Sequence, residues 1–126
     1  MAKLKAIVVE DDKQYCERFS DFLKMRFGCD VVMSFSGADA IAVLDKEKFE
    51  IMLLDLKMPG IDGFTVLAHA LKVNPSIIPV VISGVTDDSI ADKAEAMGAW
   101  FMSKPVELKA LEYVLNSLMK KQKLIP

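Results

Sequence analysis

Short apolar runs alternate along the chain with longer stretches in which apolar residues recur at helical spacing. The runs consist mainly of Val, Ile, Leu and Met, which is typical of strands that helices cover on both faces of a parallel sheet. Their alternation with helical stretches indicates βαβ units rather than hairpins. The pattern therefore predicts an α/β domain with five strands, at residues 6–9, 31–35, 51–54, 77–83 and 99–103.

Helix starts and stops fall between these runs. Aspartate can cap the first turn of a helix, glycine can end one, and the residue before a proline disfavours helical backbone. The last helix is expected over 106–121, and the final residues "KQKLIP" are expected to fray. Pro79 lacks an amide donor, which indicates the beginning of a strand or an interrupted ladder. The start and stop residues are Asp11 or Asp12, Gly28, Asn74, Asp87 and Gly98.

The composition is that of one ordinary domain. The chain has 126 residues, 52% of them hydrophobic, and no repeat or linker divides it, so residues 1–126 are expected to form a single domain. The net charge of −2 is spread along the chain without a basic stripe, so we expect no direct binding of nucleic acid. No segment approaches the roughly 20 apolar residues of a membrane span, so we expect a soluble, cytoplasmic protein. Cys16 and Cys29 form no CxxC pair and are expected to pack as reduced thiols.

Polar residues follow four of the expected strands at the point where each strand ends. In an open parallel sheet, ligands bind beyond the carboxyl ends of the strands, where the strand order reverses. If the first and third strands are neighbours, their carboxylates face each other and repel unless a cation neutralises them. Several hard oxygen ligands suit Mg²⁺, which retains some of its waters. The strand-end residues are Glu10, Asp11, Asp12, Asp55, Ser83, Ser103 and Lys104.

The same edge carries the groups that phosphoryl transfer needs. Lys104 offers a positive charge and Ser83 a hydroxyl, which together with a divalent cation stabilise a transferring phosphoryl group. A carboxylate nucleophile such as Asp55 can then form an aspartyl phosphate. Each residue alone has an ordinary interpretation, as a helix cap, a turn former, a strand end or a solvated lysine. Their shared position at strand ends favours a site over these separate interpretations.

Four motifs in order resemble the receiver domain of the bacterial response-regulator family over essentially the whole chain. They are "VVEDD" (8–12), "LLDLKMPGIDG" (53–63), "PVVISG" (79–84) and "MSKP" (102–105). The resemblance implies a doubly wound, flavodoxin-like α/β fold with five parallel strands in the order 2-1-3-4-5. It also implies a Mg²⁺ cofactor and a cis peptide bond between Lys104 and Pro105.

The resemblance assigns a role to each strand-end residue. Glu10 stands where many members have Asp, and Gly84 where alanine is frequent; neither change removes the chemistry. The aromatic switch position falls on Phe101, which lacks the phenol of a tyrosine, so a switch there must work by burial of the ring. The implied roles are metal binding for Glu10 and Asp11, phosphoacceptor and metal ligand for Asp55, a metal-binding backbone carbonyl for Lys57, a switch hydroxyl for Ser83 and phosphate contact for Lys104.

The function implied is a phosphorylation-driven signalling switch. A sensor histidine kinase or phosphotransfer protein would donate its phosphoryl group to Asp55, and the fourth helix, fifth strand and last helix would then present a changed face to an output domain or effector. A phosphatase with an aspartyl nucleophile would have a second acid two residues on, where Lys57 stands. A degenerate receiver would lack an acid, the hydroxyl or the lysine. We therefore expect no turnover enzyme.

Several points stay open from the sequence. The Lys57 side chain is either a solvated loop lysine or a group that shields the phosphorylated state from water. His69, the only histidine, has no second ligand at metal spacing, which favours a structural role. The cognate kinase, the output partner, homodimer formation and the presence of further domains cannot be read from these residues.

Overall fold

Within residues 3–84 and 88–126, which the computed structural model describes, five strands form one parallel sheet. The strands pair in the order β2-β1-β3-β4-β5, which confirms the order that the resemblance implied. Every ladder is parallel, and the pairing of β1 with both β2 and β3 places the reversal of strand order at β1 and β3. The strands are β1 (Lys5–Val9), β2 (Asp30–Ser34), β3 (Ile51–Asp55), β4 (Ile78–Ser83) and β5 (Trp100–Ser103).

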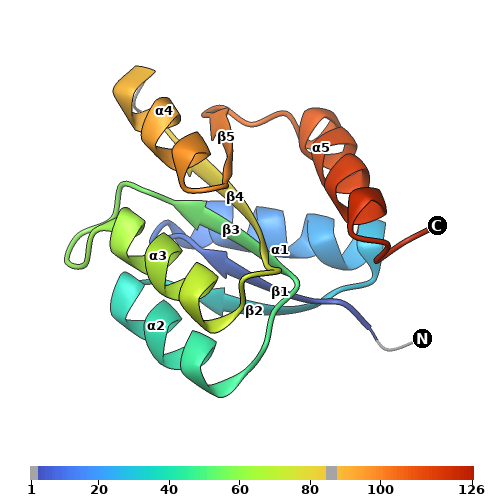
Figure 1. Cartoon of the computed structure of the whole chain (residues 1–126), viewed down its shortest axis with the longest axis horizontal. Coiled ribbons are helices and arrows are strands. Elements are labelled where there is room, and N and C mark those ends of the chain that lie inside the picture. The colour runs from blue at the N-terminus through green and yellow to red at the C-terminus, as the bar shows by residue number, and fades with distance from the viewer. Residues whose placement is uncertain (1–2, 85–87) are drawn as a thin grey trace.

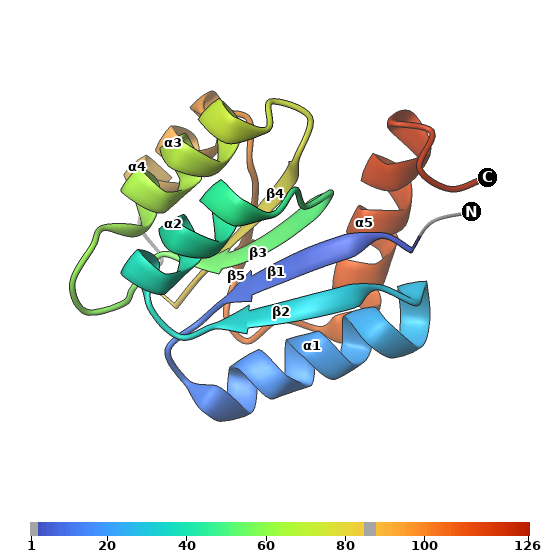
Figure 2. The ribbon, with the colours of Figure 1, turned by 90° about the horizontal axis from the view of Figure 1, so that it is seen from below.

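Helices cover both faces of this sheet (Figures 1 and 2). Alternate residues of β1 explain the two layers: Ala6 and Val8 pack in a core shared with α1 and α5, whereas Ile7 and Val9 pack in a core shared with α2 and α3. A strand covered on both faces is apolar throughout, as the run 51–54 predicted. The helices are α1 (Lys13–Phe27), α2 (Gly37–Lys46), α3 (Gly63–Val73), α4 (Asp88–Ala96) and α5 (Leu108–Lys121).

The described helix ends follow the predicted signals, and the structure decides between Asp11 and Asp12 as the N-cap of α1. Asp12, not Asp11, caps α1, because its carboxylate accepts hydrogen bonds from two amides of the first turn, at 2.9 and 3.2 Å. Gly28 and Gly98 follow α1 and α4 with φ of +64° and +96°, a conformation that glycine adopts without strain. The proposed cap Asp87 lies outside the described residues. Because Asp12 caps α1, the carboxylate of Asp11 is available for another role.

The residues after the last helix, for which the sequence predicted fraying, form a hydrogen-bonded turn in the structure. Leu124 donates its amide hydrogen to the carbonyl of Met119 at 2.9 Å, and Leu124 and Ile125 pack against the core beside α1 and α5. Lys123 supports this reversal with φ of +60° and a bond from its amide to the Lys120 carbonyl. These bonds form a Schellman motif, which the sequence conceals because lysine occupies the usual glycine position.

Two smaller expectations are confirmed. Pro79 is the second residue of β4, and pairing with β5 begins only at Val80, so the missing amide lies at the beginning of the strand. Cys16 and Cys29 are free and buried, and burial raises the pKa of each thiol to about 11. Among the helices described, none has the length and apolar character that a bilayer crossing requires.

Candidate functional site

Three carboxylates meet beyond the ends of β1 and β3. Because Val9 pairs with Leu54, the residues that follow are brought side by side. Glu10, Asp11 and Asp55 each place a carboxylate oxygen within 4.8 Å of the others, the only such acidic group in the described part of the chain. Glu10 and Asp55 are buried, whereas Asp11 is exposed. The predicted acidic cluster is therefore formed, with one member open to solvent.

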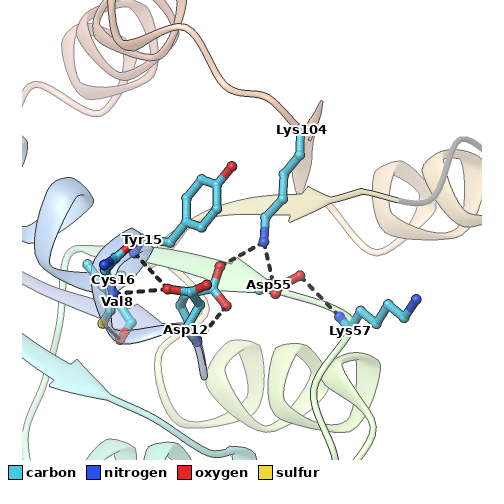
Figure 3. Close-up of polar contacts among 9 residues, drawn as sticks. Val8, Asp12, Tyr15, Cys16, Asp55, Lys57 and Lys104 are labelled. Atoms are coloured by element: carbon cyan, nitrogen blue, oxygen red, sulfur yellow. Dashed lines mark hydrogen bonds and ion pairs between the residues drawn. The ribbon is translucent and has the colours of Figure 1, made fainter.

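Lys104, which directly follows the edge strand β5, bridges the two buried carboxylates. Its Nζ lies 2.8 Å from Glu10 Oε1 and 3.2 Å from Asp55 Oδ2, and Figure 3 shows the side chain reaching down to Asp55. Its amide donates to the Ser83 carbonyl at 2.9 Å, which continues the pairing of β4 with β5 by one residue. The peptide bond to Pro105 is cis, as the resemblance implied. Lys104 thus neutralises acids that stand far from it in the sequence.

Backbone amides fix the orientation of both buried acids. Asp55 Oδ1 accepts from the amide of Lys57 at 3.1 Å, and Glu10 Oε2 accepts from the amide of Asp12 at 3.2 Å. The Lys57 side chain is exposed and extends away from Asp55 (Figure 3). The backbone of Lys57 therefore belongs to the pocket, while its ammonium group makes no contact with Asp55 in this state.

The pocket shifts the pKa values of two of its groups. Burial raises the pKa of Glu10 to about 7, against the opposing hydrogen bond from Lys104. Burial lowers the pKa of Lys104, but its hydrogen bond to Glu10 and the charge of Asp55 outweigh this effect and raise it above the ordinary value. Positive charge is therefore stabilised in this pocket, and crowded negative charge is not.

Ser83 and Phe101 lie on β4 and β5, the two strands that follow β3 in the sheet. Ser83 ends β4 and is buried one residue beyond Ile82, the register partner of Asp55. Phe101 pairs with Val81 and lies partly buried against the core under α2, α3 and α4. The switch roles that the resemblance implied for these two residues stay predictions.

Two contacts were missed by the sequence reasoning. Lys104 Nζ lies 4.6 Å from the centroid of the Tyr15 ring, in the first turn of α1. His69 on α3 lies 2.6 Å from Asp45 on α2, so its structural role includes an ion pair when the ring is protonated. An aromatic residue soon after the acids of "VVEDD" was the available signal for the Tyr15 contact.

Together the fold and this pocket define a receiver-type α/β domain, with buried acids and a lysine beyond the carboxyl ends of its strands. The family described as "Response regulator receiver domain" matches residues 6–116. The chain therefore belongs to the response regulator receiver domain family. Receiver domains of this family are the phosphorylation-dependent signalling switches of two-component systems.

Known proteins resemble the chain in sequence and in structure. Transcriptional regulatory protein ZraR of Salmonella typhimurium is 27% identical over 118 residues, which cover 93% of this chain and 26% of ZraR. A receiver domain protein (CheY-like) from Methanospirillum hungatei is 22% identical, with a TM-score of 0.87 and coverage of 98% of this chain and 100% of that one. A Burkholderia pseudomallei response regulator with a phosphorylated aspartic acid and a calcium ion is 21% identical, with a TM-score of 0.83 and coverage of 96% and 72%. The chain thus spans about a quarter of the length of the ZraR relative.

Proposed function

We propose that Asp55 accepts a phosphoryl group from the phosphohistidine of a sensor kinase or phosphotransfer protein. The observation that carries the proposal is the setting of this carboxylate: it is buried, held by the Lys57 amide and neutralised by Lys104. Burying two carboxylates side by side is costly even with a lysine between them, so their presence at the strand ends supports a chemical role. The phosphorylated aspartate of the Burkholderia relative supports the same chemistry.

The transfer uses groups that the pocket already holds. A carboxylate oxygen of Asp55 forms the new bond to phosphorus while the bond from phosphorus to the donor imidazole nitrogen breaks. Lys104 and the Ser83 hydroxyl then bind phosphoryl oxygens and stabilise the charge that they carry. Because Lys104 already contacts Asp55, its movement toward a phosphoryl group on that residue is small.

The acidic cluster fits a magnesium ion. Three carboxylates provide hard oxygen ligands yet leave room for water and phosphate, which suits Mg²⁺ better than a closed protein cage. Glu10, Asp11 and Asp55, with the backbone carbonyl of Lys57, would hold the ion. When bound, Mg²⁺ supplies positive charge that offsets the negative charge of the carboxylates and the phosphoryl oxygens.

Mg²⁺ titration of the unphosphorylated protein is expected to shift the NMR signals of residues around Glu10 and Asp55. Asp11→Asn should lose most of this response, because a neutral amide replaces the exposed carboxylate of the cluster. Asp12→Asn is the matched control: Asp12 caps α1 and lies outside the cluster, and asparagine is an equally good cap. An unchanged titration in Asp11→Asn would place the ion elsewhere.

The face formed by α4, β5 and α5 would carry the signal to a partner. In α4, residues 88–96, Ala94 is the one fully buried residue, and β5 is an edge strand on which Trp100 is 48% exposed. Elements with so little burial can be repositioned at low cost in free energy. Ser83 precedes α4 in the chain and Lys104 follows β5, so a phosphoryl group that draws both toward Asp55 acts on this face. An output domain or effector would bind the repositioned face.

A small-molecule phosphodonor, acetyl phosphate with Mg²⁺, tests the function without a kinase. Intact-mass measurement should show one added phosphoryl group, and NMR should show shifts that extend from the pocket to α4, β5 and α5. A protein that gains no phosphoryl group is not a phosphorylation switch. Labelling with shifts confined to the pocket would contradict the proposed output face.

Lys57→Ala is expected to shorten the half-life of the phosphorylated protein by about three- to tenfold, a barrier change of about 0.6 to 1.4 kcal/mol. The reason is exclusion of water: the loop places the long, exposed side chain beside the pocket, although it extends away before phosphorylation. Lys57→Met keeps the length without the charge and should retain the long half-life. Equal half-lives in wild type and Lys57→Ala, at constant Mg²⁺, would make Lys57 a solvated loop residue.

A further inference from the structure

The ammonium group of Lys104 is held from three directions by three different elements. Glu10 after β1 and Asp55 at the end of β3 accept hydrogen bonds from it, at 2.8 and 3.2 Å. The face of the Tyr15 ring, on α1, covers a third side with its centroid 4.6 Å from Nζ. Only 20% of the Lys104 side chain is exposed. The ring therefore replaces solvent on the side where no carboxylate lies.

Both the backbone and the ring of Tyr15 are held in place by neighbouring residues. Its amide donates to the capping carboxylate of Asp12 at 3.2 Å, so the backbone is fixed at the start of α1. Its ring lies against that of Phe19, with centroids 6.0 Å apart, and Phe19 is buried in the core. The Tyr15 hydroxyl points away from the carboxylates (Figure 3). The ring face, rather than the hydroxyl, is thus what the residue presents to Lys104.

The contact has a consequence for phosphoryl transfer. A lysine side chain is flexible, and its ammonium is free to leave for solvent once one of its carboxylate partners is modified. A phosphoryl group on Asp55 changes the carboxylate that Lys104 contacts. The attraction between an ammonium and a ring face does not depend on that carboxylate, so the ring continues to hold the charge at the edge of the pocket.

We propose that Tyr15 is a positioning residue for Lys104, whose ring keeps the ammonium directed at the phosphoryl group on Asp55. The proposal rests on the proposed function, since it needs Lys104 to act on phosphoryl transfer. The Tyr15 ring should therefore change the rate of phosphoryl transfer but not the residue that is phosphorylated.

The test compares rates of labelling by acetyl phosphate at fixed, saturating Mg²⁺. Tyr15→Leu, which keeps apolar bulk without a ring face, should slow labelling about three- to tenfold. Tyr15→Phe should match wild type. In a Lys104→Met background, Tyr15→Leu should cause no further loss, because the ring then has no ammonium to position. Tyr113→Leu is the control: it makes the same substitution at an exposed tyrosine of α5 and should not change the rate of labelling.

A spectroscopic readout separates positioning from loss of packing. The side-chain Hε protons of Lys104 should resonate upfield in wild type and Tyr15→Phe, because they lie over an aromatic ring, and should move downfield in Tyr15→Leu. The proposal is overturned if Tyr15→Leu labels at the wild-type rate, if Tyr15→Phe is as slow as Tyr15→Leu, or if Tyr15→Leu causes the same loss without Lys104. Failure of the proposed function looks different: wild type itself would not be labelled at Asp55.

Discussion

Asp55→Asn is expected to abolish incorporation of the acid-labile phosphoryl group from acetyl phosphate. The amide that replaces the carboxylate is nearly the same size but is a poor nucleophile, so the fold should survive while the reaction does not. Lys104 keeps its 2.8 Å hydrogen bond to Glu10, which preserves the charge balance around the remaining buried acid. Intact mass before and after mild acid or base treatment measures the loss.

Two variants show whether the label belongs to Asp55 alone. His69→Gln should be labelled like wild type, because His69 on α3 makes its hydrogen bond to Asp45 on α2 rather than to the acids of the pocket. Ser83→Ala should be labelled more slowly yet on the same residue, since the proposed role of the hydroxyl is to assist the transfer and not to receive the group. A label that persists in Asp55→Asn, or that peptide mapping places on Ser83 or His69, would contradict the mechanism.

Gly63→Ala is expected to lower the free energy of unfolding by about 2 kcal/mol, the cost of forcing a methyl group into a packed site. A Cβ at Gly63 would lie 2.7 Å from the Cα of Leu56 and 3.0 Å from its carbonyl oxygen. Those atoms are backbone and cannot rotate away as a side chain can. Because Leu56 follows Asp55 directly, the same strain should displace the acceptor and slow labelling.

Gly84→Ala is the control for this exchange. A Cβ at Gly84 would meet only the Cδ of Lys104, at 4.0 Å, which is ordinary van der Waals contact. Its stability should stay within about 0.5 kcal/mol of wild type, as for most surface substitutions. Urea unfolding followed by circular dichroism measures both variants. Equal stabilities would mean that Leu56 and the start of α3 separate readily in solution.

Much of this architecture was predictable because all strands of a parallel sheet end at the same edge, whatever their order in the chain. Apolar runs located the strands, and the rule that strand ends share one edge brought Glu10 and Asp55 together. The strand order itself came from the resemblance of motifs. The glycines at 28 and 98 were readable as stops because their backbone conformation excludes most other residues.

Three features of the structure were not predictable, because no local sequence pattern specifies them. Lys123 adopts the backbone conformation expected of glycine, so the ordered turn after α5 had no visible signal. The contact between Tyr15 and Lys104 joins a helix to a loop nearly ninety residues away in the chain, and only the packed fold specifies it. The sequence also does not specify the direction of the Lys57 side chain, since an exposed lysine has many rotamers of similar energy.

If Mg²⁺ binds at the acidic cluster as proposed, the ammonium group of Lys104 competes with the ion for Glu10 and Asp55. A tethered ammonium is present at a high effective concentration and can never diffuse away, so it occupies the acids whenever the ion leaves. A magnesium ion would have to displace the ammonium group, which would weaken the apparent affinity for the ion without any change in its ligands. We therefore expect Lys104→Met to bind Mg²⁺ more tightly than wild type although it transfers phosphoryl groups more slowly. Lys104 would thus lower the affinity for Mg²⁺ and allow the ion to exchange rapidly.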